Sequence, residues 1–235
     1  MKIEIWSDVI CPFCYIGKRN FEAALKQFEH ASELEIVWKS FQLDPSIPED
    51  LEESQETYLS KRKGLALQQV KAMLAQVSEM ARGVGLQYQL EKSVVANTKK
   101  AHRLIQMAKT KGLGDEAEES LFHAFFIEGR NIADNHELQS IGLAIGLSKD
   151  EVSEALSDAQ YEQAFHQDLA EAQQLGISGV PFFVFDRKYG ISGAQPVPVF
   201  VETLKKSYAE WRGIQPSLNI DVQQGPSCDV NGNCS

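Results

Sequence analysis

The sequence predicts an α/β protein in which two strand-containing segments form one sheet and a long helical segment is inserted between them. Three observations support this fold class. Residues 2 to 7 follow a strand pattern and lead into a helix and a second strand. Residues 52 to about 168 show only helical periodicity. Strand patterns then return near Val180 and precede a final helix, so a βαβ unit and a ββα unit enclose a helical block.

The N-terminal unit is defined by a change of period. Ile3 and Ile5 alternate with polar residues in the first strand. Apolar residues then recur at helical spacing, which predicts a helix from about Pro12 to Glu29. A second strand is predicted between Leu34 and Leu43, before Pro45 breaks the pattern.

In the helical block, apolar stripes end at glycines, which favour helix C-termini. These glycines are Gly83 and Gly85, Gly112 and Gly114, Gly129, and Gly146. Ser148 and Glu151 have the spacing of a capping box that begins a further helix.

The C-terminal unit predicts two short strands, over residues 180–185 and at Ile191–Ser192, and then an amphipathic helix. From residue 215 onward the chain is polar and rich in turn residues. We therefore expect a discontinuous sheet domain over residues 1–50 and 170–212. A helical insertion domain over residues 51–169 and an exposed tail over residues 213–235 complete the predicted organisation.

Charge and hydropathy argue against two classes of partner. The 235 residues include 33 acidic and 23 basic ones, which gives a net charge of −10, whereas binding to nucleic acid relies on basic patches. No stretch approaches the roughly 20 apolar residues of a membrane-spanning helix. The N-terminus also lacks the pattern of a secretory signal. We expect a cytoplasmic protein with no nucleic-acid and no membrane partner.

The first of two cysteine pairs has the setting of a redox motif. Cys11 and Cys14 follow the first strand and begin a helix, with Pro12 and Phe13 between them. Free backbone N–H groups and the helix dipole stabilise a thiolate on Cys11. Cys14, one helical turn on, is placed to resolve a mixed disulfide held on Cys11. Because Cys14 points into the first turn, we expect Cys11 to be the more exposed thiol.

A zinc site is the main alternative, because one C-x-x-C supplies two of the four ligands that a structural site needs. Cys228 and Cys234, or His30, could complete it. A pair of inert thiols is another alternative. The position between a strand and a helix, near a βαβ pattern, favours redox chemistry.

A second signal lies at Pro181, which begins a strand-like run although it removes a ladder donor. An ordinary trans proline at the start of a strand is one interpretation. In the cis form, Pro181 would turn the chain and leave the backbone of Val180 free to pair with an extended ligand.

The order of these segments resembles the DsbA-like branch of the thioredoxin superfamily, and more narrowly its cytoplasmic FrnE-type oxidoreductases. The resemblance covers about residues 1 to 212 and rests on Ser7–Cys14, Asn97–Thr98 with Ala101–His102, Ile177–Phe183 and Ser192–Gln195. It implies an α/β thioredoxin-like fold with a large all-helical insertion domain. It also implies that Cys11 is the nucleophile, that Cys14 resolves, and that Pro181 is cis and binds substrate with Val180.

Relatives within this resemblance supply the rival function, that of a glutathione-dependent isomerase or transferase. In those isomerases a serine takes the place of Cys11, and a Ser-Asp pair at the position of Ala194–Gln195 holds glutathione. Both departures favour exchange on protein or small-molecule disulfides. We expect no tightly bound cofactor, with glutathione as a candidate reductant or ligand held by Val180 and Gln195.

Three further residues are candidates for the lining of the site. Asp8 is either a proton-transfer group or, as we favour, a turn or helix-capping carboxylate. His102 lies on the apolar stripe of its helix, where a packed, hydrogen-bonded histidine is the ordinary finding, although the resemblance includes it in the site. Trp6 is expected to form an aromatic wall near the motif.

The tail carries the second cysteine pair, Cys228 and Cys234, on either side of a tight-turn signal. We advance it as a second redox pair that exchanges with Cys11. Idle thiols in a disordered tail are the alternative. A non-enzymatic metal-binding or scaffold protein is the third functional class.

Overall fold

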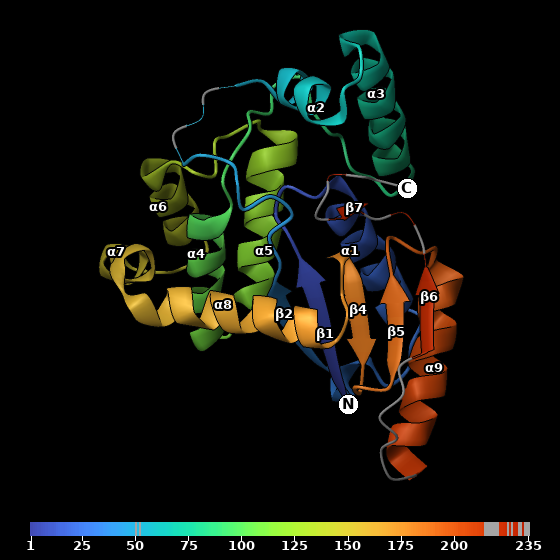
Figure 1. Ribbon diagram of the computed structural model, residues 1–235. Coiled ribbons are helices and arrows are strands. Elements are labelled where there is room, and N and C mark those ends of the chain that lie inside the picture. The colour runs from blue at the N-terminus through green and yellow to red at the C-terminus, as the bar shows by residue number, and fades with distance from the viewer. Residues whose placement is uncertain are drawn as a thin grey trace.

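The computed structural model describes residues 1–49, 51, 53–213, 221–224, 226, 228–229 and 232. Its main sheet has the strand order β2-β1-β4-β5-β6 (Figure 1). The strands are β1 (Lys2–Ser7), β2 (Glu35–Ser40), β4 (Phe182–Phe185), β5 (Tyr189–Ser192) and β6 (Asp221–Gln224). Strand β1 runs parallel to β2 and antiparallel to β4. The N-terminal and C-terminal units therefore form one sheet, as the sequence predicted.

Strand β6 corrects the predicted boundary of the tail. Residues 221–224 pair in parallel with residues 189–192 of β5, so this part of the tail extends the sheet. Only one of the four residues, Val222, is apolar. An edge strand held by backbone pairing needs no apolar run, which is why no strand pattern predicted it.

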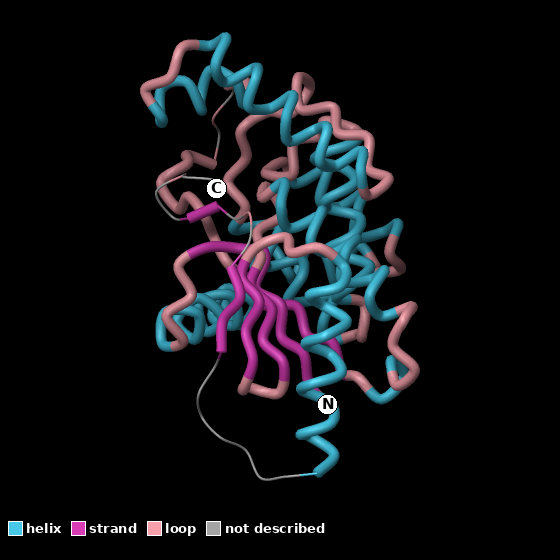
Figure 2. Tube along the Cα trace, turned by 90° about the vertical axis from the view of Figure 1, so that its right-hand side faces the viewer, coloured by secondary structure: helices cyan, strands magenta, loops and turns pink. Residues whose placement is uncertain are grey.

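Two helices pack together against one face of the sheet, α1 (Pro12–Leu25) and α9 (Val197–Gly213). Helix α1 ends four residues before the predicted Glu29, although i→i+3 hydrogen bonds continue the turn to Phe28. A short 3₁₀ turn, η1 (Ala31–Glu33), leads from there to β2. Figure 2 shows the twist of the sheet from the side.

The helical block follows β2 and lies beside and over the β2 side of the sheet (Figure 1). Its elements are α2 (Gln55–Lys63), α3 (Leu67–Gly83), α4 (Lys99–Thr110), α5 (Gly114–Phe122), the π-helical turn η2 (His123–Ile127), α6 (Asn135–Ala144), α7 (Lys149–Ser157) and α8 (Ala159–Gln174). The predicted capping box at Ser148 and Glu151 is confirmed. Helix α8 crosses the predicted boundary between residues 169 and 170 and leads into β3 (Gly179–Val180).

The core has two parts, because β1 is buried on both faces. Ile3 and Ile5 pack with Phe21 of α1 and Phe200 of α9, whereas Trp6 belongs to the larger cluster that continues into the helical block. None of the described helices is both long and apolar enough to cross a membrane. The redox motif lies where these two parts meet, at the end of β1.

Candidate active site

The redox motif occupies the N-terminal end of α1, as the sequence predicted. Cys11 is the N-cap residue and Pro12 begins the helix, where a missing N–H costs nothing. The turn is closed by hydrogen bonds from the Cys11 N–H to the Asp8 carbonyl, 2.9 Å, and from the Cys14 N–H to the Cys11 carbonyl, 3.0 Å. The motif is thus fixed by its own backbone.

Pro181 lies against this helix, and the Val180–Pro181 peptide bond is cis, the isomer that the resemblance implied. The Sγ atom of Cys11 donates to the Val180 carbonyl at 3.5 Å. A Cβ atom on Gly17 would lie 3.1 Å from Cγ of Pro181, so glycine permits a close approach of α1 to the proline. These contacts bring the two sequence signals into one site.

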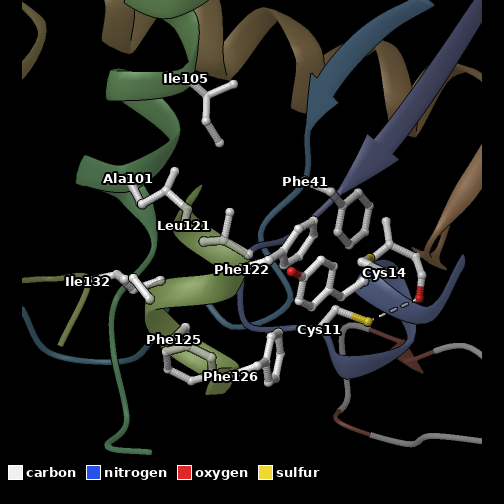
Figure 3. Packing of buried hydrophobic residues seen from close by; sticks show 14 of the residues in the cluster. Cys11, Cys14, Phe41, Ala101, Ile105, Leu121, Phe122, Phe125, Phe126 and Ile132 are labelled. Atoms are coloured by element: carbon white, nitrogen blue, oxygen red, sulfur yellow. Dashed lines mark hydrogen bonds between the residues drawn. The ribbon is translucent and has the colours of Figure 1, made fainter. Parts of the chain in front are cut away.

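The expectation that Cys11 is the more exposed thiol is wrong. The relative exposure is 0% for Cys11 and 1% for Cys14. Figure 3 shows both cysteines beside the aromatic cluster that contains Phe122 and Phe126. On its other side the Cys11 sulfur faces the Val180 carbonyl. Segments distant in sequence therefore cover a thiol that the helix end alone would leave open.

Cys14 is held as a neutral thiol. Its pKa is raised well above 9.0 by burial first, and further by the hydrogen bond and charge of Cys11. Hydrogen bonds from the Ser7 hydroxyl and the Asp8 backbone oppose this rise. A nucleophilic attack by this thiol would therefore require a group that removes its proton.

The backbone of Val180 is not free, which corrects another expectation. Strand β3 pairs antiparallel with β7 (Cys228–Asp229), with Val180 opposite Cys228. Figure 1 shows β7 near the start of α1. The Ala194 N–H also donates to the Pro226 carbonyl at 2.9 Å. The tail thus occupies the backbone edge beside Pro181; the side chain of Cys228 and the whole of Cys234 lie outside the described residues.

Asp8 and His102 form a buried pair behind the motif. The Asp8 carboxylate accepts the Leu43 N–H at 2.8 Å and lies 3.2 Å from Nε2 of His102. It therefore joins the loop after β2 to α4, and the predicted helix cap at Asp8 is wrong. The His102 ring stacks on Phe165 of α8, as a packed histidine does.

Trp6 and Gln195 each connect segments that are distant in the sequence. The Trp6 indole N–H donates to the Asp168 carbonyl of α8 at 3.1 Å, so this ring joins β1 to the helical block. The Gln195 amide donates back to the Ser192 carbonyl at 3.4 Å, while Asn20 of α1 holds the Gln195 carbonyl at 2.9 Å. Gln195 thus fixes the loop after β5 against α1.

A cavity of about 440 Å³ adjoins the motif. Pro12 and Phe13 line one side of it, and residues of α2 and α3, including Met73 and Val77, line the other. The lining is mostly apolar, with an ion pair between Asp44 and Arg62. The two middle residues of the motif therefore line this cavity.

The sequence reasoning missed two polar residues below the motif. Ser7 ends β1, and Glu118 comes from α5 of the helical block; both are fully buried. Glu118 shares a face with Leu121 and Phe122 at helical spacing, so a carboxylate on an apolar stripe was an available signal. No sequence pattern indicated that Ser7, at the end of β1, is the hydrogen-bond partner of Glu118.

A zinc site finds no support among the described residues, where no three histidine, cysteine, aspartate or glutamate residues form a ligand group. His30 stacks on Tyr208 of α9, with ring centroids 4.5 Å apart, and so does not face the motif.

Comparison with known proteins decides the family. The sequence model of the DSBA-like thioredoxin domain matches residues 2–205. This chain belongs to that family. A probable DsbA oxidoreductase from Streptomyces coelicolor is 36% identical, with a TM-score of 0.86 over 100% of this chain and 98% of its own. The uncharacterised protein YwbO of Bacillus subtilis is 28% identical over 86% of this chain and 94% of its own.

More distant structures share the DsbA-like fold. The cytosolic disulfide reductase DsbM from Pseudomonas aeruginosa is 16% identical, with a TM-score of 0.64 over 89% of this chain and 99% of its own. A 2-hydroxychromene-2-carboxylate isomerase is 12% identical, with a TM-score of 0.65 over 92% and 100% of the two chains. The family supports oxidoreductase activity in general, and its structural neighbours include both functional classes weighed above.

Proposed function

We propose that this DsbA-like protein exchanges thiols and disulfides of protein or small-molecule substrates through Cys11 and Cys14. The main support is the position of Cys11, which caps α1 and directs its sulfur at the Val180 carbonyl beside Pro181. The N-terminal end of a helix favours negative charge, and the thiolate is the attacking form of a cysteine. The second cysteine lies one turn away, as an intramolecular resolving thiol requires.

In the reducing direction, the Cys11 thiolate attacks one sulfur of the substrate disulfide. A Cys11–substrate disulfide forms and the other substrate sulfur leaves as a thiolate. Cys14 then loses its proton and attacks Cys11, which forms the Cys11–Cys14 disulfide and releases the second substrate sulfur. The protein pair is oxidised and the substrate disulfide becomes two thiols. The reverse sequence oxidises a dithiol substrate.

An extended substrate would pair with the backbone of β3, and so we propose that it displaces β7. In the resting protein Cys228 lies opposite Val180 in the register of these strands. That register supports a role for Cys228 and Cys234 as a second redox pair that exchanges with Cys11.

Glutathione is the proposed small-molecule reductant. A DsbM structure from Pseudomonas aeruginosa has been solved with glutathione, and the Cys11–Cys14 pair here permits a dithiol–disulfide cycle. Glutathione-dependent isomerisation is the rival function, because an isomerase of the same fold is among the structural neighbours.

Reduction of insulin and equilibration with glutathione buffers test the proposed function. We expect Cys11→Ser to abolish exchange, because the attacking sulfur is lost. Cys14→Ser should accumulate a mixed disulfide on Cys11, which mass spectrometry detects. Glutathione-dependent isomerase turnover that survives in Cys14→Ser, together with no exchange by the parent protein, would favour the rival.

A further inference from the structure

We infer that Glu118, a carboxyl group of the helical insertion, takes up and returns the proton of the Cys14 thiol through the Ser7 hydroxyl. This inference rests on the proposed function and adds a residue to it. Glu118 acts through the Ser7 hydroxyl and does not contact the reacting sulfur atoms. It is therefore a positioning residue and not a catalytic one.

The geometry is a chain of three buried groups. The Ser7 side chain neighbours the Cys14 thiol, whose pKa it lowers. The Ser7 hydroxyl lies 3.5 Å from Oε2 of Glu118, at the outer limit of a hydrogen bond. Ser7 and Glu118 are each 0% exposed. A hydroxyl both donates and accepts, so Ser7 can pass a proton between a thiol and a carboxylate.

Glu118 has no evident structural role. Within the described part of the chain, Ser7 is its hydrogen-bond partner, and its other oxygen, Oε1, has none. A buried carboxyl with an unpaired oxygen costs free energy. A buried carboxyl group that is separated by one hydroxyl group from a thiol that must ionise indicates a role in proton transfer.

The charges around Glu118 place its titration near neutral pH. Burial first, and then the carboxylates of Asp8 and Asp115, raise its pKa to about 8, against the opposing charges of Lys18 and Lys109. These neighbours come from four places: the loop after β1, α5 itself, α1 and α4. His102 of α4 faces Asp8 on its other side. A group that titrates near the working pH both accepts and donates a proton efficiently.

In the reducing direction the Glu118 carboxylate receives the proton. The Cys14 proton passes to Ser7 while the Ser7 proton passes to Glu118, and the Cys14 thiolate attacks the Cys11 sulfur of the mixed disulfide. The Cys11–substrate bond breaks and the substrate thiolate leaves. In the oxidising direction, attack at Cys11 expels Cys14 as a thiolate, and the protonated Glu118 returns the proton along the same path.

Single-turnover resolution of a Cys11–glutathione mixed disulfide tests the inference. Reduced full-length protein is mixed with oxidised glutathione, quenched with acid, and the mixed and internal disulfides are counted by mass spectrometry from pH 6 to 9. We expect Glu118→Gln to slow the second step by roughly 10²-fold and to remove the inflection near pH 8. The first step, attack by Cys11, should change less than about twofold.

Two further variants separate a relay from a packing effect. Ser7→Ala should slow the second step like Glu118→Gln, whereas Ser7→Thr keeps the hydroxyl and should restore most of the rate. Glu116→Gln is the matched control, because Glu116 is an exposed glutamate of the same helix. It should match the parent protein at every pH.

The outcomes are distinct. Resolution by Glu118→Gln at the parent rate and with the parent pH profile would overturn the inference, and so would normal resolution by Ser7→Ala. If the parent protein formed neither a mixed disulfide nor the internal Cys11–Cys14 disulfide, the proposed function would fail instead. Urea unfolding of each variant shows whether a slow rate reflects loss of the fold.

Discussion

Glu118 also links the stability of the fold to pH. In the unfolded chain its carboxyl ionises near the ordinary value of 4.5, whereas in the folded protein it keeps its proton up to about pH 8. Between these two values the folded state binds more protons than the unfolded state, so the free energy of unfolding falls as pH rises. The difference between a pKa of 4.5 and one of about 8, at ~1.36 kcal/mol per pH unit, lowers the free energy of unfolding by ~5 kcal/mol in total. About 3 kcal/mol of this is lost by pH 7.

Glu118→Gln removes the titrating group and keeps its shape. We expect the variant to be more stable than the parent protein by about 3 kcal/mol at pH 7, with a difference that shrinks toward pH 5 and grows toward pH 8. Urea unfolding of the reduced proteins at pH 5, 6, 7 and 8 measures this difference, with Glu116→Gln as the control. A difference between Glu118→Gln and the parent that stays constant with pH would refute the assignment of a high pKa to Glu118.

Two further predictions follow from the same site. Gly17→Ala should destabilise the fold by about 1–3 kcal/mol and slow exchange, because its Cβ would lie 3.1 Å from Pro181 Cγ; the control Gly83→Ala, with no atom within 4 Å of its Cβ, should not lower the melting temperature. Combined replacement of Cys228 and Cys234 by serine should slow turnover and change the rate at which glutathione reduces the Cys11–Cys14 disulfide. Turnover and reduction equal to those of the parent would identify the tail cysteines as bystanders.

Much of the site could be predicted because its signals are local. A strand, two cysteines around a proline, and a helical pattern are contiguous in the sequence, so the position of Cys11 at the start of α1 followed from them. The isomer of Pro181 had no signal in the residues alone, since most such bonds are trans. Family resemblance, and not physical reasoning, supplied it.

The parts that could not be predicted depend on contacts between distant segments. The burial of Cys11 depends on Val180, which is 169 positions away. The pairing of β3 with β7 uses backbone groups, which every sequence offers and no side-chain pattern marks. Glu118 was missed although it lies on an apolar stripe, and only the folded structure shows that it faces Ser7.

If polypeptides are substrates, as proposed above, the pairing of β7 with β3 sets an affinity threshold for them. Because β7 belongs to the same chain, it competes for the Val180 edge at an effective concentration on the order of millimolar. A free polypeptide must displace β7 from the Val180 edge before its disulfide reaches Cys11. A small disulfide that needs no strand pairing does not have to displace β7. Under the proposed function, β7 therefore selects polypeptides by how well they pair with β3.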